Sequence, residues 1–130
     1  MERMKSLSEK RPIIEATLEG KKALFLLDTG ATVGILSKGI VKKYGLKVGR
    51  DFGKLVGAGG EFRAKYCHSF ATLRSGPVTK PITQFLIGNI DQVIESIREQ
   101  TGIEIQGIIS YPQMQFAGVV IDTQDNSITF

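Results

Sequence analysis

Residues 25–32, which read Phe-Leu-Leu-Asp-Thr-Gly-Ala-Thr, constrain the fold more than any other stretch of this chain. Their apolar run is typical of a buried strand, and it leads directly into Asp28 and a tight turn of small residues. Because burial of an unpaired carboxylate is costly, Asp28 needs hydrogen-bond donors, an ionic partner or a function. We therefore treat Asp28 as the first candidate functional residue.

Length and composition indicate one globular domain. The chain has 130 residues, of which 42% are hydrophobic and 23% charged, and these values are ordinary for a folded domain. The net charge of +4 comes from scattered lysines and arginines, so we expect no dense basic face and no nucleic-acid partner. We expect a flexible N-terminal arm over residues 1–11 and a folded domain over residues 12–130.

The sequence gives no sign of a membrane segment. No apolar run approaches the length of a membrane span, and residues 1–11 lack the apolar centre of a signal peptide. We therefore expect a cytoplasmic protein without a membrane partner.

Cys67 is the only cysteine and His68 the only histidine. One cysteine excludes an internal disulfide, and the pair offers too few ligands for a closed zinc site. Neighbours in a strand point to opposite faces, which disfavours a thiol nucleophile paired with its own base. We predict Cys67 in the core, His68 outside, and neither a metal nor an organic cofactor.

The segment after the arm predicts a β hairpin that carries Asp28 at its far end. The expected order is strand, turn, strand, short strand and brief helix, placed at residues 13–18, 19–21, 23–27, 33–36 and 38–44. Ser37 is a plausible N-cap for that helix, and Gly45 ends it.

A glycine-rich segment follows between two strand-like stretches, and it predicts a hairpin tip. Its candidate binding residues are Val56, Gly57, Ala58, Gly59 and Gly60. A dinucleotide-binding loop is disfavoured because the glycine spacing is wrong and a strand, not a helix, follows. The segment can also be a hairpin turn without a role.

The second half predicts strands over residues 64–73, 78–87 and 103–110, and one helix. Asn89 and Gln92 have the spacing of a capping box, Gly102 ends the helix, and Val93, Ile94 and Ile97 share one face.

These features together resemble the retropepsin-like aspartic proteases, the single-lobe branch of the pepsin-like enzymes. The resemblance implies a mainly β, closed barrel-like lobe with two or three short helices. It also implies a catalytic Asp28 supported by Thr29, Gly30 and Ala31, and a glycine-rich flap that closes over substrate.

The end of the chain resembles the family's ending, in which a glycine, here Gly107, lets a strand cross behind the aspartate loop. Gln106 and Pro112 depart from residues that many family members carry, so the support of the active site can differ. The helix near residues 90–101 is absent from retroviral members, and we interpret it as an insertion that shapes a pocket rim or a subunit contact.

The resemblance implies an endopeptidase that is active as a homodimer on extended peptides. The mechanism needs two aspartates that share a proton, and of the five aspartates only Asp28 has the right setting. Asp122 also follows an apolar run, but Gln124 stands where a glycine is required, so we interpret Asp122 as a turn residue.

Two other functions stay open. The domain can keep the fold and the dimer yet serve as a peptide-binding or assembly module with little catalysis. A nucleic-acid-binding β domain is the other alternative, which a steep salt dependence of oligonucleotide binding would revive.

Overall fold

The computed structural model describes residues 2–57 and 60–130, which contain twelve strands, one 3₁₀ helix and three α helices. The strands are β1 (Arg3–Lys5), β2 (Ile13–Leu18), β3 (Lys21–Asp28), β4 (Gly34–Ser37), β5 (Val48–Gly57), β6 (Gly60–Cys67), β7 (Ala71–Ser75), β8 (Val78–Ile82), β9 (Phe85–Gly88), β10 (Gly107–Ser110), β11 (Val120–Asp122) and β12 (Ser127–Thr129). The helices are η1 (Lys38–Ile40), α1 (Val41–Tyr44), α2 (Asp91–Thr101) and α3 (Tyr111–Ala117).

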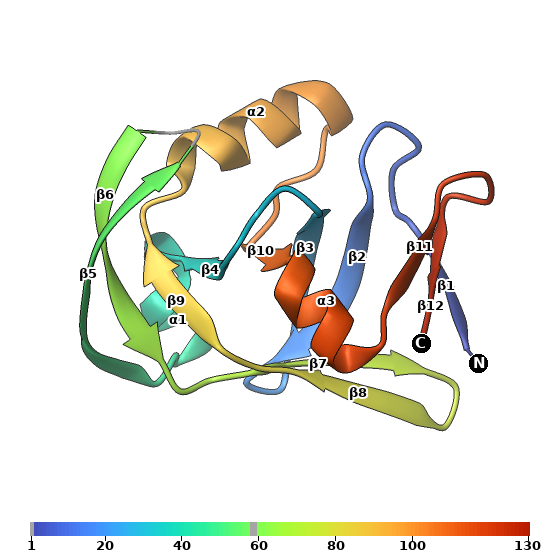
Figure 1. The fold of residues 1–130 in the computed structure, drawn as a ribbon, viewed down its shortest axis with the longest axis horizontal. Helices are drawn as coiled ribbons and strands as arrows, with labels where there is room; N and C mark the ends of the chain where they lie inside the picture. The colour runs from blue at the N-terminus through green and yellow to red at the C-terminus, as the bar shows by residue number, and fades with distance from the viewer. Residues whose placement is uncertain (1, 58–59) are drawn as a thin grey trace.

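Nine strands form one strongly bent sheet in the order β5-β6-β9-β4-β10-β3-β2-β7-β8 (Figure 1). The expectation of a mainly β fold with short helices is confirmed, although β5 and β8 do not pair, so the sheet does not close into a barrel. β3 lies in the interior of the sheet, between antiparallel β2 and parallel β10. Asp28 therefore ends a strand whose neighbours hold it on both sides.

The hairpin of β2 and β3 forms as the sequence predicts. The outer residues of β2 alternate with buried ones, because one face of the strand meets the core. The turn uses Glu19 and Gly20, both with positive φ (50° and 77°), which suits a two-residue hairpin.

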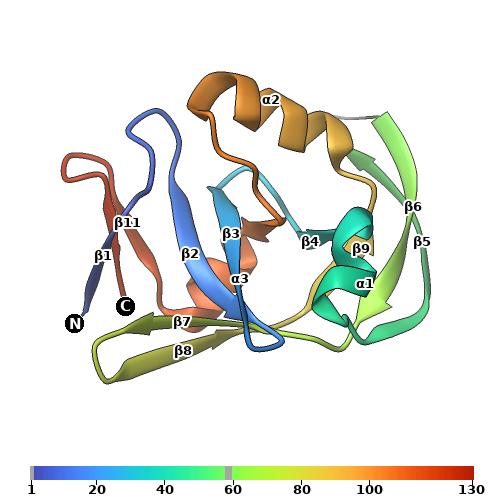
Figure 2. The same ribbon diagram turned by 180° about the vertical axis from the view of Figure 1, so that it is seen from behind.

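Two apolar cores lie on opposite faces of the central strands. The larger core contains Phe25 and Phe85, whose ring centroids are 5.7 Å apart. The smaller core joins Leu26 of β3 to Ile97 of α2, and α2 lies across the top of the molecule in both views (Figures 1 and 2). Because residues alternate along β3, Leu26 points to α2 and its neighbours point to the larger core.

The two chain ends pair in a second, three-stranded sheet of order β1-β12-β11. Arg3 and Lys5 both contact the Asp125 carboxylate, and the backbones of Glu2 and Phe130 exchange two hydrogen bonds. Part of the expected arm over residues 1–11 is thus a strand; the division at residue 12 stays a prediction.

Several predicted elements differ in their bounds. The stretches at residues 64–73 and 78–87 each divide into two strands, because the chain leaves the sheet at residues 68–70 and 83–84. The strand expected from residue 103 begins only at Gly107. Asn89 accepts a hydrogen bond from the Asp91 amide (2.9 Å), but the expected capping box with Gln92 does not form.

Across residues 2–57 and 60–130, we find no helix with the length and hydropathy needed to cross a membrane.

Candidate active site

Asp28 stands at the end of β3, where the strand leaves the core. Its side chain is partly buried, whereas Thr29 and Gly30 are exposed. The Gly30 amide donates to Asp28 Oδ1 at 2.9 Å, and a Cβ on Gly30 would lie 3.3 Å from that oxygen. The small residue after Thr29 therefore brings a backbone donor close to the carboxylate.

The turn after Asp28 is fixed by backbone hydrogen bonds. The Ala31 amide donates to Asp28 O (3.1 Å), and the Tyr111 amide donates to Ala31 O (3.2 Å). The first bond closes the turn, and the second ties it to α3. The structure thus places Asp28, Thr29, Gly30 and Ala31 in one short, pinned loop, which we call the aspartate loop.

Ser110 is the residue beside Asp28 in the neighbouring strand, where the register pairs Ser110 with Asp28 and Gly107 with Phe25. Gly107 does need to be a glycine, because a Cβ there would lie 2.8 Å from the Phe25 ring and 3.0 Å from Ile35 O. The residue of β10 that lies beside Asp28, however, is Ser110 and not Gly107.

Gln113 is a buried polar residue that the sequence analysis did not single out. Its Oε1 accepts from the amide and the hydroxyl of Ser110 (2.8 and 3.0 Å), and its Nε2 donates to Thr83 O (2.7 Å). The side chain also lies against Gly34, where a Cβ would be 1.9 Å from Oε1. Gln113 thus links three segments behind the aspartate loop.

A signal for Gln113 is present in the sequence. Ser110 and Gln113 have the serine-to-glutamine spacing of a capping box, and the structure forms that box at the start of α3. Pro112 lies in the first turn of α3, where its missing amide costs no hydrogen bond. Gln106, the other departure, accepts from the Leu24 amide through its side chain (2.6 Å). Both departures therefore have structural roles.

The glycine-rich hairpin is the second part of the predicted site. β5 and β6 pair up to Gly57 and Gly60, and Val56 beside the tip is 83% exposed. Ala58 and Gly59 lie outside the described residues. The hairpin carries surface ion pairs, Lys54 with Glu61 and Arg63 with Asp51.

Besides the two pairs of residues that join β6 to β9, the hairpin contacts the rest of the domain through Phe62. A Cβ on Gly88 would lie 2.4 Å from the Phe62 ring, so the ring lies directly on the backbone of Gly88. Gly88 ends β9, just before α2 begins. The part of the hairpin near its tip is therefore in contact with the residue that precedes the segment leading into α2.

The remaining candidate groups lie in other parts of the fold. Asp122 Oδ1 accepts from the amides of Gln124 and Asp125 (3.0 and 3.1 Å), so its interpretation as a turn residue is confirmed. Cys67 is buried and His68 exposed, as predicted, and burial raises the pKa of the Cys67 thiol. No cluster of three His, Cys, Asp or Glu side chains exists among residues 2–57 and 60–130.

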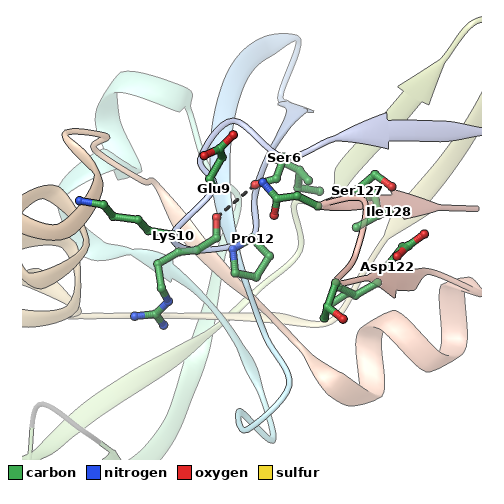
Figure 3. A pocket seen from close by; sticks show the side chains of 12 residues that line it. Ser6, Glu9, Lys10, Pro12, Asp122, Ser127 and Ile128 are labelled. Atoms are coloured by element: carbon green, nitrogen blue, oxygen red, sulfur yellow. Dashed lines mark hydrogen bonds between the residues drawn. The ribbon is translucent and has the colours of Figure 1, made fainter.

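A cavity of about 200 Å³ lies between the N-terminal segment and the hairpin of β11 and β12 (Figure 3). Asp122 and Ile128 form one side of it, and Glu9 and Pro12 the other. None of the residues that line this cavity belongs to the aspartate loop.

Known proteins were compared with this chain by sequence and by structure. The sequence profile of the family described as aspartyl protease matches residues 14–112, which include Asp28, the hairpin and α2. No match is found among curated proteins.

Solved structures with this fold come from a virus, a protozoan and a bacterium. The EIAV protease, in complex with an inhibitor, is 19% identical with a TM-score of 0.59, covering 92% of this chain and 99% of its own. The retroviral protease-like domain of Ddi1 from Leishmania major is 18% identical with a TM-score of 0.57, covering 91% of this chain and 86% of its own. A retropepsin-like aspartic protease from Rickettsia conorii is 17% identical with a TM-score of 0.56, covering 97% of this chain and 86% of its own.

Proposed function

The chain belongs to the aspartyl protease family, and we propose that it is an endopeptidase whose active site combines Asp28 from two copies of the chain. One observation carries the proposal. Of the five aspartates, only Asp28 ends a buried central strand and continues into a loop that donates a backbone amide to its carboxylate. Hydrolysis by this family's mechanism needs a second such carboxylate, and a symmetric dimer supplies it.

The proposed chemistry uses the two Asp28 carboxyl groups in different protonation states. The ionised carboxylate takes a proton from a water molecule, whose oxygen attacks the carbonyl carbon of the peptide bond. The protonated carboxyl donates its proton to the carbonyl oxygen. Collapse of the tetrahedral intermediate breaks the C–N bond: the proton held by the first carboxyl goes to the leaving amine, and one hydroxyl of the intermediate returns its proton to the second carboxylate.

Two close carboxyl groups titrate as a pair, because like charges resist joint ionisation. We therefore expect activity to be higher at acidic to near-neutral pH than at alkaline pH. The exposed Thr29 lies beside Asp28, where its hydroxyl can bond to the other copy. The hairpin of β5 and β6, with Gly57 and Gly60 near its tip, would close over an extended peptide and exclude water.

The test measures cleavage of a mixed peptide library between pH 4 and 7 as a function of protein concentration. Wild-type cleavage should rise more steeply than linearly with concentration through the range in which dimers form. Asp28→Asn should keep the fold and the dimer but lower kcat by roughly 10²–10⁴-fold or more. Asp122→Asn, the matched control, should remain active, because Asp122 only organises a turn.

Mixing the two proteins gives a sharper result. An excess of Asp28→Asn chains should suppress the wild-type activity, because mixed dimers contain only one intact carboxyl. Full activity in the mixture, or activity linear in concentration down to the monomer, contradicts a shared site. A folded dimer that binds extended peptides without cleaving them would favour the peptide-binding module instead.

A further inference from the structure

The role of α2 can be inferred from the two regions that it connects. Shortly before its start, Gly88 of β9 contacts the Phe62 ring, which lies near the tip of the hairpin. Along its length, Ile97 is buried with Leu26, two residues before Asp28. Figures 1 and 2 both show α2 running from the ends of β5 and β6 toward the ends of β2 and β3. The helix therefore runs from the hairpin toward the strand that carries Asp28.

The apolar face of α2 is only partly covered. Ile90 and Ile97 are 4% and 2% exposed and anchor the helix in the smaller core. Val93 and Ile94, between these anchors, are only partly buried. Because residues three and four apart share one helix face, all four side chains point toward the sheet, and the middle two retain access to solvent.

The same incompletely covered cluster includes residues next to Asp28. Ala31 of the aspartate loop and Ile35 of β4 are partly buried and pack against the smaller core, as do Val93 and Ile94. Partly buried apolar side chains of α2, of the loop that holds Asp28 and of β4 thus border the same core, and we call these four residues the apolar seam. Covering partly exposed aliphatic side chains with another apolar group lowers the free energy, because their surface is removed from water.

The exposed side of α2 is charged. Glu95 and Glu99 are exposed, and Arg98 pairs with Glu95 and Glu104 of the same chain. These charged groups stay in water when a peptide side chain enters the seam and covers Val93 and Ile94, so this contact carries no desolvation cost for them.

We propose that Val93 and Ile94 of α2 are specificity-determining residues, which form the apolar wall against which a substrate side chain flanking the scissile bond packs. This inference rests on the proposed protease function. The wall selects the size of an apolar side chain, because the anchors on either side fix its position. In this proposal α2 contributes side chains to the substrate site.

The test compares matched peptides that differ at one position flanking the scissile bond, carrying Ala, Val, Leu or Phe there. Ile94→Ala should shift the ratio of kcat/KM for Phe over Val by about tenfold or more toward Phe, because removal of three side-chain carbons enlarges an apolar pocket. Val93→Ala should shift it in the same direction. Ser96→Ala, on the exposed face of α2, should leave the ratio unchanged.

Thermal unfolding and sedimentation identify variants that act through the fold or the dimer. A variant that cleaves with an unchanged size preference overturns the inference, and so does one whose only defect is a weaker dimer. Ile94→Val, a smaller change, should shift the preference in the same direction even if Ile94→Ala does not fold.

Failure of the protease function would be a separate result, seen as no cleavage by wild type at any concentration. The wall is then tested by the affinity of the same peptides for the wild-type chain. A change of about tenfold in the Phe-to-Val affinity ratio in Ile94→Ala supports the wall without catalysis, whereas equal ratios overturn it.

Discussion

The aspartate loop and the hairpin of β5 and β6 are built in opposite ways. The loop follows a buried strand, and backbone bonds tie it to itself and to α3. Most of β5 is exposed, its pairing with β6 is irregular near Gly53, and β6 meets the main sheet at only two pairs of residues. Chemistry requires a fixed carboxylate, whereas binding of an extended peptide requires a segment that can move aside.

The two regions should therefore respond differently to the same kind of substitution. Changes behind the aspartate loop should lower stability and activity together. Changes in the hairpin should affect substrate handling more than stability.

The largest effect is expected from Gln113→Leu. This change removes the partners of the buried Ser110 amide and of Thr83 O, and an unsatisfied buried group is costly. We expect the free energy of unfolding to fall by about 2–4 kcal/mol, together with the loss of cleavage at pH values where the protein is still folded. Urea denaturation measures the first effect. Gln115→Leu, exposed on the same helix, is the control and should change little.

A matched pair of glycines gives the most direct comparison. Neither Gly34 nor Gly57 has a positive φ, so only the available space differs. Gly34→Ala would place its Cβ 1.9 Å from Gln113 Oε1, whereas Gly57→Ala meets nothing within 4 Å. We expect Gly34→Ala to cost about 1–3 kcal/mol of stability and Gly57→Ala less than about 0.5 kcal/mol. Equal losses would show that the two regions are equally rigid.

Phe62→Ala tests the contact between the hairpin and Gly88. Because the ring is only partly buried, we expect about 1 kcal/mol of lost stability. The hairpin should position substrate less well, with roughly a three- to tenfold lower kcat/KM. Phe116→Ala, at a residue that is 90% exposed, is the control. A stability loss without any change in peptide kinetics would contradict a role of the hairpin in binding.

The smallest effect is expected on the pH dependence of stability. A variant at Asp125 distinguishes a loss of activity caused by protonation at the active site from a loss caused by acid unfolding. The hydrogen bond from Arg3 and that from Ser127 hold the pKa of Asp125 below its usual value, with Lys5 adding to the effect. A lowered folded-state pKa means that the carboxylate stabilises the fold above its unfolded pKa, and this contribution is lost as the pH falls through the folded pKa. Asp125→Asn should thus slightly lower the unfolding temperature at pH 7, and the difference from wild type should vanish in strong acid.

The activity profile of Asp125→Asn should keep the wild-type shape, because Asp125 pairs with the terminal strand β1 and not with the aspartate loop. A displaced pH optimum in this variant would mean that acid acts on activity through the terminal sheet.

The sequence by itself determined the local parts of the site. Local conformational preferences explain three features: the apolar run before Asp28, the small residues of its turn and the hairpin glycines. Such preferences act wherever the segment lies in the fold. Gly102 ends α2 in the left-handed conformation for the same reason. The exact strand breaks at residues 68–70 and 83–84 escaped prediction, because they depend on where the bent sheet changes partners.

Only the tertiary structure decided which distant residues support Asp28. Pairing of β10 with β3 brings Ser110 beside Asp28, and Gln113 then fills the space against Gly34. The packing of α2 against Leu26 also depends on contacts between distant segments, and it leaves Val93 and Ile94 partly covered. Strand register and close packing are set by contacts between segments far apart in the chain, so no local pattern around Asp28 contains them.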